Sequence, residues 1–147
     1  DKMACTTRDE INRIFAHERV WAGSAARYQC GLSWPSITES LMRGCIAIHG
    51  MSPGSWGRYG HHLVEPVVAL YGNADLLTRV EFKEGAQINL AFHRKNDRPA
   101  IMCFTDYYDA FKKMLTGFVA FARDGIEPFP RQQMIDTANI ILRGEKI

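Results

Sequence analysis

Two neighbouring segments of alternating polarity constrain the fold more than any other feature of this chain. Every second residue is apolar or threonine in LLTRVEFK (residues 76–83), and every second residue is apolar in AQINLAFH (residues 86–93). A period of two predicts strands of a sheet that has one covered face. Glu84 and Gly85 are expected to join the two segments as a hairpin, and RPAIMCFT (residues 98–105) predicts a third strand after a turn at Asn96 and Asp97.

Helical patterns lie on both sides of these strands. Thr7 and Glu10 form a capping box before a short helix, PSITESLMRG (residues 35–44) predicts a second, and residues 130–143 predict the last. HHLVEPVVALYG (residues 61–72) predicts a buried helix that begins at residues 61–65, because Pro66 is expected in its first turn. RVWAGSAARY (residues 19–28) is interpreted as a strand that runs into a loop, and CIAIHGMS (residues 45–52) as a strand.

A long helix is predicted after Asp106 and ends at Gly125. The stripe expected to face inward consists of Tyr108, Phe111, Leu115, Phe118 and Ala122, widened by Met114 and Val119. Together these patterns predict an α+β (α/β) fold, with a mixed, mainly antiparallel open sheet that helices cover on one face.

Composition excludes several classes of function. The 147 residues correspond to one domain, or to one domain and a fragment, and 46% are hydrophobic, which is enough for a core. With 18 basic and 16 acidic residues in no basic cluster, the chain is not expected to bind nucleic acid. Its four cysteines form no metal-binding pair or disulfide pattern, and no signal peptide or membrane span is apparent, so we expect a cytoplasmic protein.

The histidine pair in WGRYGHHLVEP (residues 56–66) is the strongest candidate for chemistry. His61 and His62 are expected where a glycine-rich loop meets a buried helix, half-buried and reachable from a cleft. Imidazole suits proton transfer near neutral pH, and backbone N–H groups at such a position favour anions. The residues alone leave open a helix cap without chemistry. His61 and Glu65, four residues apart, have no evident third ligand, so no metal site is predicted.

Three segments, in this order, resemble the Gfo/Idh/MocA family of nicotinamide-dependent oxidoreductases. DKMACT (residues 1–6) is similar to the family's E-K-P turn, and YGHHLVEPVVALYG (residues 59–72) is similar to its G-x-H-x-x-[DE] helix. The segment from YYDAFKKMLTGF to MIDTANII (residues 107–141) is similar to its C-terminal signature, and AARY (residues 25–28) fits the arginine-aromatic pair before the substrate cleft.

The resemblance implies roles for individual residues. Lys2 would approach the nicotinamide and the substrate hydroxyl, and His62 would be the acid/base or a substrate ligand. The chain departs from the pattern where Met3 replaces the proline and where Arg58 stands in place of an aspartate, which puts a proton relay in doubt. The residues assigned to substrate binding are Arg27, Tyr28, Trp56, Tyr59 and His61.

The resemblance also implies a domain organisation and a function. Residues 1–44 would be the last β-α units of a Rossmann-type domain, and residues 45–147 a substrate-binding and oligomerisation domain. A full-length parent would use NAD or NADP on a sugar, polyol or related hydroxy compound. This chain alone is not expected to bind either cofactor, because it has no G-x-G-x-x-G or P-loop motif. We expect a homodimer through the open sheet face; the alternative function is a non-catalytic ligand-binding or dimerisation module.

Overall fold

The computed structural model describes residues 7–29 and 35–144, in which five α-helices and a four-stranded sheet confirm the α+β class. The elements in chain order are α1 (Arg8–Phe15), the 3₁₀-helix η1 (Ala25–Tyr28), α3 (Pro35–Met42), β1 (Cys45–Ser52), α4 (Trp56–Tyr71), β2 (Leu77–Phe82), β3 (Asn89–Arg94), β4 (Asp97–Cys103), α5 (Tyr107–Asp124) and α6 (Arg131–Arg143). None of these described helices is long and apolar enough to cross a bilayer.

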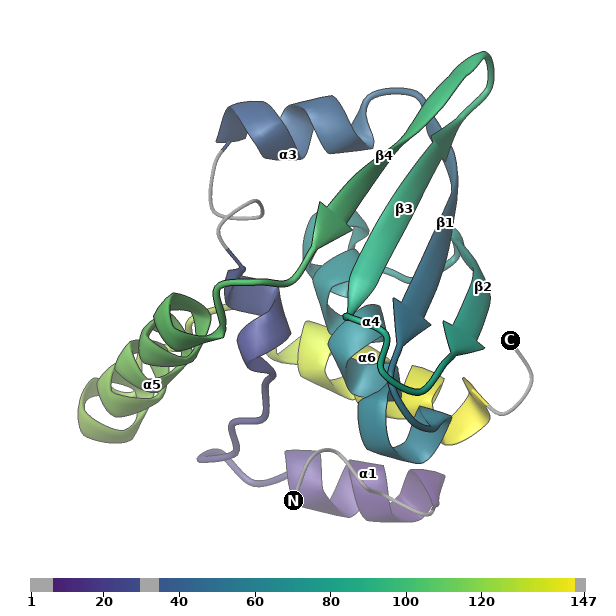
Figure 1. Ribbon diagram of the computed structural model, residues 1–147. Coiled ribbons are helices and arrows are strands. Elements are labelled where there is room, and N and C mark those ends of the chain that lie inside the picture. Colours follow the sequence, from purple (N-terminus) through teal and green to yellow (C-terminus); the bar gives the residue numbers. More distant parts are fainter. Residues whose placement is uncertain (1–6, 30–34, 145–147) are drawn as a thin grey trace.

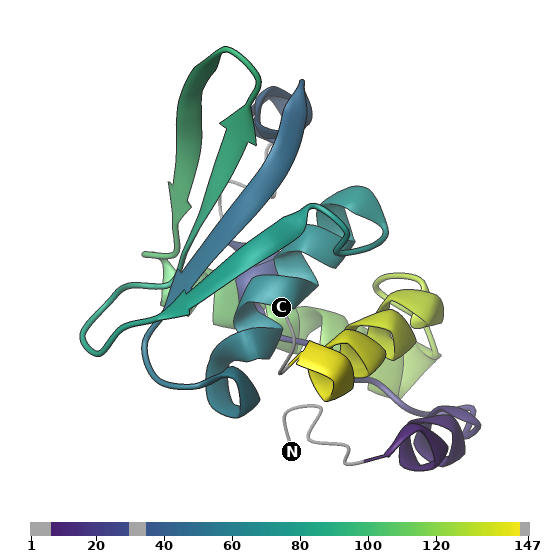
Figure 2. The ribbon, with the colours of Figure 1, turned by 90° about the vertical axis from the view of Figure 1, so that its right-hand side faces the viewer.

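The sheet is mixed and mainly antiparallel, as the sequence predicts. Its strand order is β2-β1-β3-β4, with β1 parallel to β2 and antiparallel to β3, while β3 and β4 form a hairpin. Figures 1 and 2 show α4 against one face of the sheet, with α6 and α1 in further layers behind it. The predicted coverage of one face by helices is therefore confirmed.

The predicted hairpin between residues 76–83 and 86–93 is wrong. β1 lies between β2 and β3, so these two strands do not pair. A parallel neighbour requires a crossover of a dozen or more residues, and the 16-residue helix α4 supplies it between β1 and β2. The short connection through Glu84 and Gly85 therefore passes over the end of β1 and leads to the strand on its other side.

Helix α4 begins earlier than predicted, at Trp56 and not within residues 61–65. Pro66 consequently lies in the helix interior, where it cannot donate the backbone hydrogen bond to His62. The glycines that suggested a loop are part of the helix. A Cβ on Gly60 would lie 2.8 Å from the Trp56 ring, so glycine is required there for the indole to pack against the first turn.

The strand predicted at the start of residues 19–28, before a loop, is also wrong. Residues 20–24 have no regular secondary structure, and AARY forms η1, a single turn of 3₁₀-helix. Ser24 caps this turn, because its side-chain oxygen accepts a hydrogen bond from the backbone N–H of Ala26 at 3.1 Å. Within residues 7–29 and 35–44 the structure contains helices and no strand. The division of the chain into domains at residues 1–44 and 45–147 stays a prediction.

Helix α5 turns a different face inward from the one predicted. Its buried residues are Ala110 and Phe121, whereas Tyr108 and Leu115 of the predicted inward stripe are exposed. Gly117 also faces η1, and a Cβ there would be in ordinary van der Waals contact with the Tyr28 hydroxyl. The remaining members of the predicted stripe are exposed at Phe111, Phe118, Val119 and Ala122 and half-buried at Met114.

Two apolar clusters stabilise this arrangement. The larger one joins the sheet to α4 through fully buried side chains such as Ile48, Leu63 and Phe92. The smaller one consists of Ile11, Phe15, Met134 and Ala138 and joins α1 to α6. Because α6 also packs on α4, the terminal helices and the sheet belong to one stack of layers.

Candidate functional site

A cavity of about 350 Å³ lies where η1, the N-terminal half of α4, the connection before β3 and the start of α5 meet. Its size is within the range of small-molecule sites. The residues that line it are Ala25, Ala26, Pro53, Tyr59, His62, Ala86, Gln87, Ile88 and Tyr107. Polar groups from three separate segments therefore converge on one small, otherwise apolar space.

His62 is held in the cavity wall by Ser24. The Ser24 hydroxyl oxygen lies 2.6 Å from Nδ1 of His62, and the same oxygen caps η1. His62 is the seventh residue of α4, so the backbone N–H groups at the start of this helix lie one to two turns away. The predicted use of those N–H groups at the histidine pair is therefore wrong, because the predicted helix start was too late.

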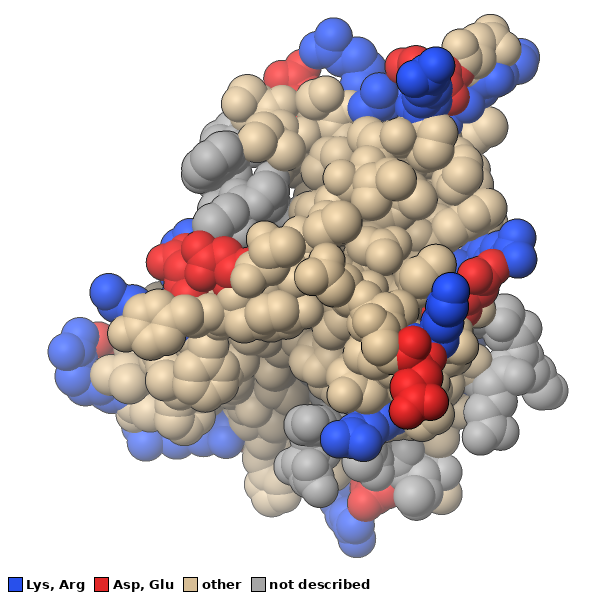
Figure 3. Space-filling model, viewed as in Figure 1, with Lys and Arg blue, Asp and Glu red and all other residues tan. Residues whose placement is uncertain are grey.

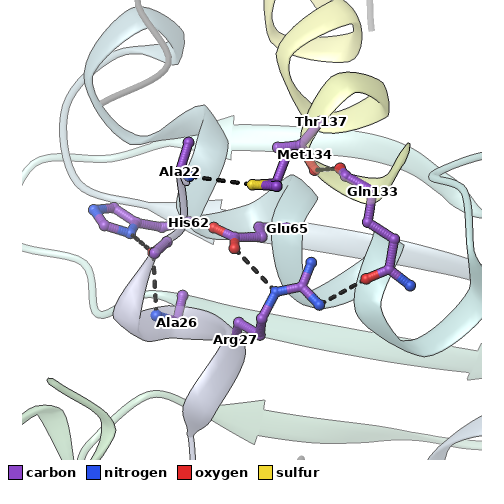
Figure 4. A network of polar contacts seen from close by, with 9 residues as sticks. Ala22, Ala26, Arg27, His62, Glu65, Gln133, Met134 and Thr137 are labelled. Carbon is purple, nitrogen blue, oxygen red and sulfur yellow. Dashed lines mark hydrogen bonds and ion pairs between the residues drawn. The ribbon is translucent and has the colours of Figure 1, made fainter. Parts of the chain in front are cut away.

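A buried ion pair lies directly behind this histidine (Figure 4). Nε of Arg27 lies 3.0 Å from Oε1 of Glu65, and only 8% and 1% of the two side chains are exposed. A second Arg27 nitrogen donates to the side-chain oxygen of Gln133 at 2.7 Å, and the guanidinium stacks 3.7 Å from the centre of the Phe129 ring. Arg27 thus connects η1 to α4 and α6 at one point.

The ionisation of Glu65 is strongly perturbed. Complete burial raises its pKa from the ordinary value of 4.5 to about 7, because an ionised carboxylate loses its hydration there. The charge of Arg27, its hydrogen bond and a smaller contribution from the backbone N–H of Ser24 oppose this rise. Oε2 of Glu65 has no hydrogen-bond partner among the described residues, so Arg27 engages only one of the two carboxyl oxygens.

The structure brings two of the predicted site residues together in the cavity, Tyr59 and His62, whose rings lie 6.0 Å apart. His61 is buried, with its ring 3.8 Å from that of His62. Arg27 belongs to the ion pair behind the cavity. Lys2 and Met3 lie outside the described residues.

Trp56 and Tyr28 have structural contacts elsewhere. The Trp56 indole donates to the backbone oxygen of Ile141 at 2.9 Å and meets the Phe82 ring edge-on, so it joins α4 to α6. The Tyr28 hydroxyl is buried against α5, and burial raises its pKa. Neither residue lines the cavity.

Sequence reasoning missed the supporting roles of Ser24, Glu65 and Gln133. Glu65 had a visible signal, because it is a charged residue in an apolar helical run, three residues after His62. A charge at a position of this kind is expected to have a buried partner. Ser24 and Gln133 gave no comparable signal, since serine and glutamine are ordinary residues of loops and helix surfaces.

The described residues do not fit a dinucleotide or a metal ion. A dinucleotide site requires a glycine-rich turn between a strand and a helix N-terminus, and no such motif occurs in the sequence. Within residues 7–29 and 35–144, no three His, Cys, Asp or Glu side chains gather as metal ligands would. Neither cofactor chemistry can therefore be assigned to the cavity walls.

Comparison of the chain with models of known protein families, with curated proteins and with solved structures finds no match. The fold and the cavity therefore define the chain only as an α+β protein with a buried ion pair behind a histidine-lined cavity.

The raised pKa of Glu65 predicts a pH dependence of stability. Between pH 4.5 and about 7 the folded state holds a proton that the unfolded state has lost, so the free energy of unfolding falls as pH rises through this range. The full loss is about 3 kcal/mol. The side chain in Glu65→Gln cannot titrate. The difference in the free energy of unfolding between wild type and this variant, measured in urea, should therefore change by this amount between pH 4.5 and 7.

Other titrating groups are common to both proteins and cancel in that difference. The matched control is Glu39→Gln, which removes an exposed carboxylate in an ion pair on α3. Its difference from wild type should stay nearly constant from pH 4.5 to 7. A similarly flat difference for Glu65→Gln would show that the pKa of this carboxyl group is not raised in the folded state.

Proposed function

We propose that the chain binds a small polyhydroxy compound in the cavity and exchanges a proton with it through His62. In this proposal it is the substrate-binding portion of a nicotinamide-dependent oxidoreductase that acts on a sugar, polyol or related hydroxy compound. The observation that carries the proposal is the 2.6 Å contact between Ser24 and Nδ1 of His62, at the wall of a cavity of ligand size.

This contact determines what the imidazole can do. With Nδ1 engaged by Ser24, Nε2 is the ring nitrogen that would exchange a proton with a bound hydroxyl group. A fixed ring orientation is what general acid–base catalysis requires, since the proton must move within hydrogen-bond distance. The contact between Ser24 and Nδ1 therefore supports the role of His62 as a positioned catalytic group.

The other walls of the cavity suit a polyhydroxy ligand. Tyr59, Gln87 and Tyr107 supply hydroxyl and amide groups that can bond to ligand hydroxyls, while Ala25 and Ile88 provide apolar surface. Burial and, to a smaller extent, the nearby Tyr59 raise the pKa of Tyr107. Its hydroxyl therefore remains a hydrogen-bond donor at neutral pH.

Only the resemblance supports the hydride-transfer part of the proposal. The described residues do not fit a dinucleotide, so we assign them substrate binding and proton exchange and no step that involves the cofactor. NAD or NADP would serve as the hydride acceptor of a full-length parent.

The second candidate function is a non-catalytic ligand-binding or dimerisation module. The observation that favours it is the exposure of several large apolar side chains along α5, which is typical of an interaction surface. The two functions differ in whether the cavity is used, and this can be tested on the chain itself.

Substitution at the histidine pair tests the use of the cavity. We expect polyols or sugars from a panel of hydroxy compounds to perturb the His62 ring resonances in NMR spectra. His62→Ala should weaken this binding about tenfold or more, the scale of one lost hydrogen bond to a charged or well-placed group. His61→Ala is the matched control and should weaken binding less, because His61 does not line the cavity.

In a full-length parent, His62→Ala should lower kcat by roughly 10²-fold or more, the usual scale for a lost general acid or base. Equal losses for the two alanine variants would contradict the assignment of His62. Absence of binding across the whole panel would favour the non-catalytic module.

A homodimer through the open sheet face is a further part of the proposal. This face includes Arg79 and Glu81 of β2, which form an ion pair at 2.5 Å, and Asn89 and His93 of β3. Side chains of mixed sign and polarity on one face can match across a two-fold axis. The presence of Ala91 beside them leaves room for close approach of a second sheet.

Charge substitution on this face tests the predicted dimer. Arg79→Glu with Asn89→Glu places like charges across the axis and should shift a dimer toward monomer in light scattering at tens of micromolar. Arg8→Glu with Asn12→Glu on the exposed side of α1 changes the net charge equally and should leave the dimer intact. An unchanged dimer in the first variant would contradict the sheet-face interface.

A further inference from the structure

His49 and His93 form a pair of imidazoles on the open face of the sheet. They come from the adjacent antiparallel strands β1 and β3, and the centres of their rings are 4.0 Å apart. The residues next to them, Ile48 and Phe92, are fully buried in the core that the sheet forms with α4, so alternation places both histidines on the opposite face. The pair is separate from the cavity, whose walls include neither residue.

One nitrogen of this pair lacks a partner within the described part of the chain. Nε2 of His93 is buried and makes no hydrogen bond with any described residue. A buried polar atom without a partner is costly, and one explanation for such an atom in a folded protein is a bound ion. Imidazole nitrogen is the commonest protein ligand of transition metals. A metal ion held between the two rings would engage the nitrogen of His93.

The spacing of the two rings suits a chelated Zn²⁺ ion. Zn–N bonds are about 2.0–2.1 Å long, so two nitrogen ligands of a tetrahedral ion lie about 3.3 Å apart. Rings whose centres are 4.0 Å apart can present nitrogens at this separation by rotation about their Cβ–Cγ bonds, for which the torsional preference is broad. The strands fix the backbones of both residues, because His93 pairs with Ala47, two residues before His49.

The charges on the open face do not oppose a cation at this position. Arg79 lies directly across from His49 on β2, but its guanidinium forms an ion pair with Glu81. Figure 3 views the molecule from the side of the open face, and the middle of the surface over the strands carries no charged side chain, with Lys, Arg, Asp and Glu at its edges. The charged neighbours of His49 on β2 are therefore a balanced pair.

The pair supplies half of the ligands that a closed zinc site requires. Structural zinc sites have four ligands, and within residues 7–29 and 35–144 no third His, Cys, Asp or Glu joins the two histidines. A two-fold axis doubles a set of two ligands, since every residue of an isologous interface occurs twice. Ala91, directly across from His49 on β3, is small and leaves room for a second sheet to approach the rings.

We propose that His49 and His93 bind Zn²⁺ together with the same two residues of a second copy of the chain, with the ion on the two-fold axis of the sheet-face dimer. The inference rests on the sheet-face dimer proposed above and is independent of proton exchange at His62. The ion joins two open faces that otherwise meet through side chains of mixed polarity. Because four ligands hold the ion only in the dimer, Zn²⁺ strengthens dimerisation by mass action.

Sedimentation of the purified chain at pH 8, where imidazole is neutral, tests the site in the presence of Zn²⁺ or of EDTA. Zn²⁺ should tighten the dimer about tenfold or more relative to EDTA. Calorimetry should give one bound ion for every two chains. His49→Gln and His93→Gln should each abolish the effect of Zn²⁺, because each removes two of the four ligands. His17→Gln is the matched control and should behave like wild type, since His17 is an exposed residue that follows α1.

Cobalt reports the geometry of the site in the wild-type chain. A tetrahedral Co²⁺ complex absorbs visible light much more strongly than the six-coordinate aqua ion, so wild type with Co²⁺ should show this strong absorption and His49→Gln should not. Urea unfolding of the two glutamine variants in EDTA should match that of wild type, which shows that they fold.

Several results would overturn the zinc site. One ion bound per chain without a change of assembly would do so, as would weak, six-coordinate Co²⁺ absorption in wild type or an equal effect of Zn²⁺ on wild type and the glutamine variants. A dimer of equal strength in Zn²⁺ and in EDTA would overturn the zinc site and leave the sheet-face dimer intact. A monomer under both conditions would overturn both, and each result leaves the role of His62 unaffected.

Discussion

The buried ion pair between Arg27 and Glu65 is the interaction on which the arrangement of the site depends. Each charged group has lost its hydration, and this cost is offset only while the other group stays within hydrogen-bond distance. Because Arg27 belongs to η1, Glu65 to α4 and the second acceptor Gln133 to α6, the pair permits only a narrow range of positions for three elements. This single-turn helix, whose Ala26 also belongs to the apolar core, is thereby fixed against α4 and α6.

The position of His62 follows from the same constraint. Ser24 precedes η1 and both caps that turn and contacts the imidazole, so whatever holds η1 also holds the histidine ring at the cavity. The chain thus separates two tasks. The ion pair and Gln133 organise the interior, while His62, Tyr59 and Gln87 are presented to the cavity. A carboxyl group with a pKa of about 7 behind the histidine also makes this support sensitive to pH.

The sequence predicted the parts of the fold that depend on local periodicity. The α+β class, the strands from β1 to β4 and the ends of α4 and α5 at Gly72 and Gly125 follow from alternation and capping. The pairing of β2 with β1 depends on a crossover that no local pattern specifies. The prediction of the inward face of α5 was wrong because the helix has two apolar sides. The side that includes the small residues Ala110 and Gly117 is the one that packs against the rest of the chain. The histidine pair was visible in the sequence as a candidate, but the residues that contact His62 and stand behind it come from distant parts of the chain.

A double-mutant cycle on Arg27 and Glu65 tests this account most directly. The free energy of unfolding would be measured in urea at pH 8, where Glu65 is ionised, for wild type, Arg27→Met, Glu65→Leu and the double variant. Each single change should cost about 3–5 kcal/mol, because it leaves a buried group without its partner. The double variant should be more stable than Arg27→Met alone, with a coupling free energy above about 2 kcal/mol. Small, additive losses would contradict the central role of the pair.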